Sequence, residues 1–219
     1  MIDFIQSETQ FFIFCLTTLF TLINPIGIAP LLLSMTERFS KQEKINIAWK
    51  GSFTAFFTLI LFSILGSFIF NVFGITIEAF QIMGGILFFR NGLRMLEVKV
   101  GRSRTTPAEQ EESQESDDIA ISPIGIPLIA GPGAITAAML LSSQTPQYYS
   151  YVTLGLSIFL VLSLVYLILR NGDVLLNVLG TTGMRIIQRL MGLILLVIAV
   201  QFVINGAVSV IRPLISPSF

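Results

Sequence analysis

The stretch Asn24-Pro25-Ile26-Gly27-Ile28-Ala29-Pro30 lies within an apolar run over residues 9–35. A proline inside a helix removes a backbone donor and clashes with the carbonyl four residues earlier, which destabilises the helix by roughly 3 kcal/mol or more. Pro25 therefore leaves the carbonyl of Thr21 without its helical donor. We expect the helix of this run to be broken at residues 24–27.

A second interrupted stretch, Pro123-Ile124-Gly125-Ile126-Pro127-Leu128-Ile129-Ala130-Gly131-Pro132-Gly133, lies in the apolar run over residues 119–143. The break in each run lies about midway between flanking polar residues, so both are expected near the middle of a bilayer. In hydrocarbon, broken backbone is tolerated only where it is buried in protein or lines a wet cavity, so both breaks should face inward. The alternative is that these prolines and glycines only kink the helices or permit close packing.

The composition places most of the chain in a membrane. Of its 219 residues, 53% are hydrophobic and 12% are charged, whereas an ordinary soluble domain has about 25% charged residues. The mean hydropathy is +0.83. Apolar runs of about 20 residues, the length that crosses a hydrocarbon core of about 30 Å, recur along the sequence. Six such spans are predicted, over residues 9–35, 47–70, 75–97, 119–143, 149–170 and 185–211.

The basic residues indicate how the six spans are oriented. If alternate loops face the same compartment, twelve of the 13 Lys and Arg residues fall on one side and only Arg212 falls on the other. Cytoplasmic loops carry the excess of basic residues. We therefore expect a multi-pass protein of the bacterial inner membrane with both termini on the non-cytoplasmic side.

A polar segment, residues 98–118, divides the chain into two three-helix repeats, residues 1–97 and 119–219. Because three is an odd number, the second repeat is expected to be inserted upside down relative to the first. The predicted fold is thus an all-α membrane protein, with six transmembrane helices as a 3+3 inverted-topology repeat in which helices one and four are discontinuous. The acidic segment is interpreted as a solvated cytoplasmic linker loop.

Broken helices offer groups that bind a small zwitterion. A half-helix that begins at Pro25 or Pro132 exposes unpaired N–H groups and the positive end of its dipole, which suit a carboxylate. The carbonyls released on the other side of each break suit an ammonium group or a sodium ion. A substrate site is predicted on the two breaks and on nearby polar positions: Thr21, Asn24, Pro25, Gly27, Gly131, Pro132, Gly133, Thr136 and Gln201.

The residue types argue against several other functions. The chain has no histidine and one cysteine, Cys15, so a disulfide framework, a zinc site and histidine acid–base chemistry are not available to it. No nucleophile, base and orienting group can be assembled from the residues present, so we expect neither an enzyme nor a bound cofactor. The net charge is zero and no basic stripe occurs, so nucleic acid is not an expected partner.

Ion coupling stays open at the level of the sequence. Proton relays in membrane proteins use Asp, Glu or His at depth, and the centres of the predicted spans lack these residues. Proton coupling therefore has no obvious carrier. Coupling to sodium held by carbonyls and hydroxyls, or passage without a coupled ion, are the alternatives.

Three motifs resemble signatures of the MarC family of bacterial and archaeal membrane proteins: the stretch 24–30, Ile82-Met83-Gly84-Gly85-Ile86-Leu87 and the stretch 126–135. Ile198-Ala199-Val200-Gln201-Phe202 with Asn205-Gly206 is similar to that family's last span. The resemblance covers essentially the whole chain apart from the acidic segment 98–118. It implies a place in the amino-acid exporter superfamily that includes LysE, and in the MarC family some members transport small neutral amino acids such as glycine and alanine.

Together, the breaks and the resemblance predict a secondary transporter of small neutral amino acids. The amino acid is expected to bind near the bilayer midplane, between the breaks of the first and fourth spans. Two alternatives are a non-transporting membrane scaffold, whose acidic segment recruits cytoplasmic partners, and a small-solute channel. The expected partners are the amino acid and the lipid bilayer, and the sequence does not indicate an oligomeric state.

Overall fold

The computed structural model describes residues 2–97, 120–144 and 150–215, and all of their regular elements are helical. In chain order these are α1 (Ile2–Ile23), α2 (Pro25–Met35), α3 (Lys41–Phe73), α4 (Ile77–Leu96), η1 (Ala120–Ile129), α7 (Pro132–Ser143), α8 (Ser150–Arg170) and α9 (Gly172–Ile215). The predicted all-α class is confirmed. The predicted linker, residues 98–118, lies outside the described residues.

Capping residues determine where α3 begins and ends. Ser40 and Glu43 form a capping box, in which Ser40 Oγ accepts from the Glu43 backbone N–H (3.4 Å) and Glu43 Oε2 accepts from the Ser40 backbone N–H (2.7 Å). This cap starts α3 among charged residues, six positions before the predicted span 47–70. Gly74 ends α3 with φ of 61°, a left-handed conformation that glycine adopts without steric penalty.

Four stretches of helix are long and apolar enough to cross a membrane: Glu8–Met35, Lys41–Gly66, Ser150–Arg170 and Thr182–Ile211. The bent pair of η1 and α7, with an angle of 59° between its parts, makes a fifth if it is one broken span. α4 has 20 residues but carries Arg90 and Arg94 near its end, and it falls outside this group. The chain is thus a multi-pass membrane protein, and length and composition identify four or five of the six predicted spans.

The last helix is longer than predicted. α9 contains 44 residues and is interrupted at Gly180, where φ is 61° and ψ is 177°. The predicted span, residues 185–211, is the part that follows this interruption. The residues before it were predicted as a connection between spans.

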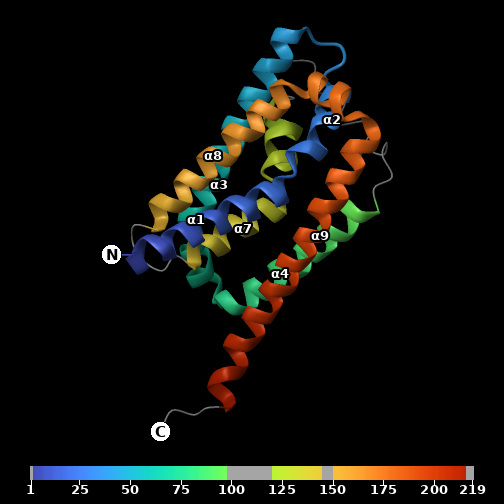
Figure 1. Cartoon of the computed structure of the whole chain (residues 1–219). Helices are drawn as coiled ribbons and strands as arrows, with labels where there is room; N and C mark the ends of the chain where they lie inside the picture. Colours follow the sequence, from blue (N-terminus) through green and yellow to red (C-terminus); the bar gives the residue numbers. More distant parts are fainter. Residues whose placement is uncertain (1, 98–119, 145–149, 216–219) are drawn as a thin grey trace.

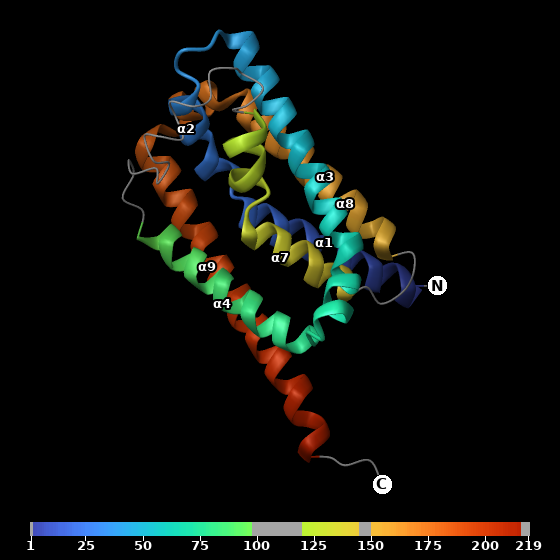
Figure 2. The ribbon, with the colours of Figure 1, turned by 180° about the vertical axis from the view of Figure 1, so that it is seen from behind.

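Two long pairs of helices frame the molecule, as Figures 1 and 2 show: α4 lies alongside α9, and α3 lies alongside α8. α4 and α9 are antiparallel, because Gly92 lies against Gly192 whereas Gly206 lies against the earlier part of α4 at Glu78. α1 and α7 lie between the two pairs, and side chains from all these helices form the core: Leu19, Leu59, Phe88, Leu140, Ile158 and Leu195.

Candidate functional site

The first interruption of the helix lies at Asn24. α1 ends at Ile23, Asn24 adopts the left-handed conformation (φ 51°, ψ 60°), and α2 begins at Pro25. The side chain of Asn24 caps α2, since its Oδ1 accepts a hydrogen bond from the backbone N–H of Gly27 at 3.2 Å. Gly27 permits this cap, because a Cβ at that position would overlap the Asn24 amide. The start of α2 is therefore closed by its own N-cap residue.

The end of α1 presents a backbone carbonyl without its helical donor. Pro25 has no N–H, so the carbonyl of Thr21 cannot form the usual bond to the residue four positions later. The N–H of Gly27 does not bond to the Thr21 carbonyl either, because it donates to the carbonyl oxygen of Asn24 at 2.9 Å. Thr21 and Pro25 are both buried, so this carbonyl lies inside the protein.

The second break has a different geometry. η1 contains extended backbone at Ser122 and Ile126, and α7 then begins after Gly131, whose φ of −73° and ψ of 169° are also extended. Gly131 has no side chain to cap the helix, and no side-chain cap is formed. Pro132 has no N–H, and the N–H groups of Gly133 and Ala134 have no acceptor within the helix. The start of α7 is therefore open, in contrast to that of α2.

The two breaks meet at Gly133. A methyl group added to this buried glycine would lie 3.4 Å from Cδ2 of Leu22, which is two residues before the first break. The same methyl group would lie 3.0 Å from Nδ2 of Asn91 on α4. The end of α1 and the second half of α4 thus both lie against the open start of α7.

This end of α7 is not sealed within the core. Gly131 and Asn91 are half-buried and Pro132 is exposed, whereas Gly133 is buried. A ligand could therefore approach the open N–H groups from the side of Pro132 and Asn91. The positive end of the α7 dipole and the amide of Asn91 both favour an anionic group at this point.

Thr136 lies one turn further along α7 and is buried. Its methyl group faces α4, because a Cβ added to Gly84 would lie 2.9 Å from Thr136 Cγ2. Positions three residues apart share a helix face, so Thr136 continues the face of α7 that carries Gly133. Thr136 therefore packs against α4, one turn beyond the open start of α7.

Gln201 is the predicted site residue that the structure separates from the breaks. Its side chain is exposed, and its Nε2 donates to Asn205 Oδ1 on the same helix at 2.6 Å. The neighbouring ring of Phe202 stacks on Phe14 with a centroid distance of 6.2 Å. Phe14 precedes Asn24 by ten residues, which is about 15 Å along a helix. Gln201 therefore lies on an exposed face of α9 and at a different depth in the helix bundle from the break at Asn24.

Asn91 is the residue of this site that the sequence did not indicate. It stands between Arg90 and Gly92 near the end of a predicted span, where a polar residue is unremarkable. Thr18 is a second buried polar residue near the break: it is fully buried on α1, and its hydroxyl has no hydrogen-bond partner within the described part of the chain. A polar residue inside a predicted span was the available signal for both.

Comparison with known proteins agrees with the motifs at these breaks. The model of the MarC family of integral membrane proteins matches residues 9–211. A UPF0056 membrane protein of Methanocaldococcus jannaschii is 37% identical over 203 residues, which are 91% of this chain and 97% of that protein. The UPF0056 membrane protein YvbG of Bacillus subtilis is 36% identical over 198 residues, which are 90% of this chain and 94% of that protein.

No solved structure matches the chain. The family match nevertheless includes both breaks, the whole of α4 and nearly all of α9. The relatives share more than a third of their residues with this chain over nearly their full length. The chain therefore belongs to the MarC family of integral membrane proteins.

Proposed function

We propose that this protein is a secondary transporter of small neutral amino acids such as glycine and alanine. The observation that carries the proposal is the uncapped start of α7 at the point where the two breaks and Asn91 meet. Unpaired N–H groups at a helix start bind anions, and half-helices that end at the binding site are a recurring feature of secondary transporters.

The two ends of a zwitterion find different partners at this junction. The carboxylate would bind the N–H groups of Gly133 and Ala134 and the amide of Asn91, and the ammonium group would bind carbonyls released at the first break, such as that of Thr21. Gly131 and Gly133 keep the approach to the backbone free of side chains. Leu22 limits the space beside Gly133, which favours a small substrate.

The residues at the two breaks favour sodium over a proton as a coupling ion. The two interrupted stretches, residues 24–30 and 123–133, contain no Asp, Glu or Lys, so a proton has no titrating carrier there. Carbonyl oxygens at broken helices coordinate sodium in other transporters. We therefore include a sodium gradient in the decisive experiment, with a proton gradient as the comparison.

The packing supports a six-span inverted repeat with halves 1–97 and 119–219, in which α4 is the third span. α3 of the first half packs against both parts of the second break, η1 and α7, while α8 of the second half packs against both α1 and α2. In the same way α4 contacts α7, and α9 contacts α2. This exchange is what a two-fold relation between the halves predicts, and rocking of one half against the other would alternate access to the site.

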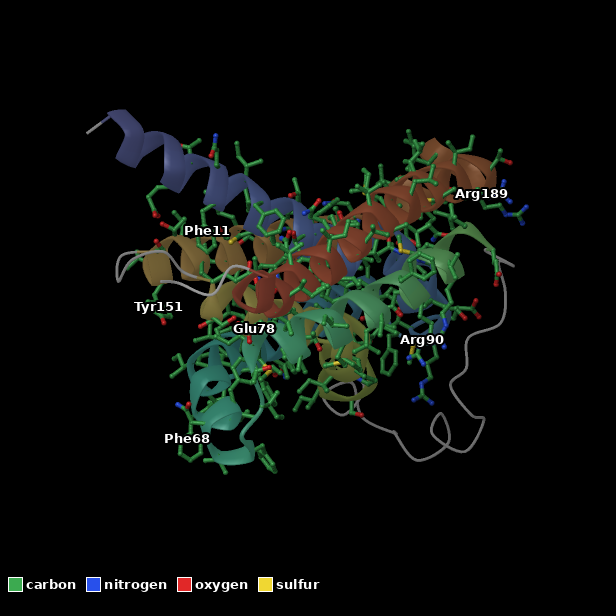
Figure 3. All side chains as sticks on the ribbon, turned by 90° about the horizontal axis from the view of Figure 1, so that it is seen from below. Phe11, Phe68, Glu78, Arg90, Tyr151 and Arg189 are labelled. Carbon is green, nitrogen blue, oxygen red and sulfur yellow. The ribbon has the colours of Figure 1, made fainter. Side chains whose placement is uncertain are left out.

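The distribution of charge supports an inner-membrane orientation with both termini outside the cytoplasm. Figure 3 places Arg90 and Arg189 toward one end of the molecule, and Phe11 and Tyr151 toward the other. The arginine end would face the cytoplasm by the positive-inside rule. Reporter fusions after residue 219 and within residues 98–118 test this: the first should be active outside the cytoplasm and the second inside it.

Uptake of labelled glycine and alanine into proteoliposomes tests the proposal. We expect uptake that saturates with substrate concentration and that a sodium gradient increases, measured against protein-free liposomes and against a proton gradient alone. Unsaturable flux would indicate a channel instead. No uptake of either amino acid by folded protein, in either direction, would overturn the assignment and favour the scaffold alternative.

A further inference from the structure

One face of α9 is exposed along most of the membrane-spanning part of this helix. Its members are spaced alternately four and three residues apart, and all are exposed: Leu190, Ile194, Val197, Gln201, Ile204 and Val208. We call this set the outer stripe of α9. Spacings of three and four residues place side chains on one side of a helix, so the six residues form a continuous line.

The outer stripe lies on the side of α9 that faces away from α4. The contacts with α4 come from other positions: Gly192 lies against Gly92, Ala199 lies against Gly85, and Gly206 lies against Glu78. Val197 and Gln201 are each two positions from Ala199, which is about 200° around the helix. No described helix covers the stripe.

Lipid can cover the apolar members of the stripe but not the amide of Gln201. The Gln201 Nε2 donates to Asn205 Oδ1 at 2.6 Å, and the two side chains form no other hydrogen bond among the described residues. The oxygen of Gln201 therefore lacks a donor, and the amide hydrogens of Asn205 lack an acceptor, among the described residues. Unsatisfied polar groups in hydrocarbon are costly.

The depth of Gln201 makes this cost relevant. The apolar span of α9 runs from Thr182 to Ile211, and Gln201 lies about 7 Å from its midpoint at 1.5 Å per residue. Half of a hydrocarbon core is about 15 Å. Gln201 is thus inside the apolar layer, where water does not solvate it.

We propose that the outer stripe of α9 binds the same stripe of a second copy of this chain, so that the protein is a parallel, two-fold symmetric dimer with Gln201 at the interface. A carboxamide both donates and accepts, so two copies of Gln201 satisfy each other across a two-fold axis. Copies with the same membrane orientation meet in this way only around an axis along the membrane normal. The interface is isologous and needs no other partner.

The spacing of the stripe suits such a pairing. Apolar residues that alternate at three and four positions form the seam of left-handed helix pairs, and a single polar residue in the seam sets register and oligomeric state. Polar side chains also hydrogen-bond between helices within membranes. The proposal concerns a surface away from the two breaks, and it holds independently of the transported substrate.

Cysteine cross-linking in native membranes tests the interface. Cys15 is buried and is the only cysteine, so Cys15→Ala provides a background for single cysteines at Val197 and Ile204, which flank Gln201 on the stripe. Mild oxidation should produce disulfide-linked dimers of both variants. Val152→Cys on α8 is the matched control, because Val152 and Val197 are both 71% exposed, and Leu160→Cys provides a control near the middle of α8.

The role of Gln201 is tested in the same background. Gln201→Leu should shift the monomer–dimer equilibrium toward monomer by about tenfold, whereas Gln201→Asn should retain most of the dimer, as counted by single-molecule photobleaching in liposomes. Equal cross-linking at Val197 and at the α8 controls would overturn the proposal. So would a wild-type protein that is monomeric in liposomes, or a dimer fraction unchanged by Gln201→Leu.

Discussion

The backbone of Gly133 lies directly against the side chain of Asn91, so that a methyl group on Gly133 would be 3.0 Å from Nδ2 of Asn91. This contact joins the first turn of α7 to the second half of α4. A residue larger than glycine at this position would require the amide of Asn91 to shift away from the open N–H groups.

Gly133→Ala should impair uptake while the helix itself is preserved. The added methyl group would shift the Asn91 amide away from the start of α7, and small displacements of binding groups reduce rates strongly, so we expect initial glycine uptake to fall at least about tenfold. Gly155→Ala on α8 is the control, because a Cβ there meets nothing within 4 Å. The control should keep its uptake and gain stability of about 0.5–1 kcal/mol.

Asn91→Asp should separate stability from binding. A carboxylate at the start of α7 interacts favourably with the helix dipole, by about 0.3–1 kcal/mol, so thermal stability should be kept or raised. The same charge would repel a substrate carboxylate, so the affinity for glycine should fall at least about tenfold. Asn171→Asp, at an exposed position, is the matched control and should leave affinity unchanged. Unchanged affinity of Asn91→Asp would remove Asn91 from the site.

Substitutions of Asn24 should distinguish its backbone conformation from its capping side chain. Asn24→Gly keeps the left-handed conformation and loses only the cap, so it should cost a few tenths of a kcal/mol. Asn24→Val should cost about 2 kcal/mol, because a β-branched residue is penalised by about 1–2 kcal/mol in this conformation and the cap is also lost. The midpoints of denaturant unfolding in detergent give the comparison, and equal midpoints would contradict it.

Gly92 and Gly192 face each other so closely that a Cβ on either would lie 3.0 Å from the carbonyl oxygen of the other. Gly92→Val or Gly192→Val should therefore separate α4 from α9 and destabilise the protein by about 1–3 kcal/mol. Because the two glycines share one contact, the effects of the two substitutions should be less than additive. Full additivity in the double variant would show that they do not act on the same contact.

Glu8 joins the beginnings of α1 and α8. Its carboxylate accepts from Ser150 Oγ and from Thr153 Oγ1, each at 2.7 Å. Hydrogen bonds to charged groups contribute about 1.5–3 kcal/mol, so Glu8→Ala should lower the free energy of unfolding by about this amount. A double-mutant cycle with Thr153→Val should give a coupling of about 1 kcal/mol or more. No coupling would mean that solvent replaces the bond.

The local features of the site were predictable from its own residues. The break at residue 24 follows from the missing N–H of Pro25, and the start of α7 follows from Pro132, because each effect depends only on residues within one turn. Thr21 at the first break is buried, whereas Pro132 at the second break is exposed, so the inward orientation expected of both breaks stays a prediction. The role of Asn91 could not be predicted, since it depends on contact with a helix that follows much later in the chain.

A helical, membrane-spanning chain with two interruptions follows from the residues alone, because apolar content and the chemistry of proline and glycine act where those residues stand. The contact of Asn91 with the open end of α7 and the outward position of Gln201 depend on how the helices pack, whereas the cap on α2 and its absence on α7 follow from Asn24 and Gly131 themselves. Each residue turns a helix by about 100°, so the neighbours of a side chain depend on how one helix is rotated against another. Packing across the whole molecule determines that rotation, and no local pattern specifies it.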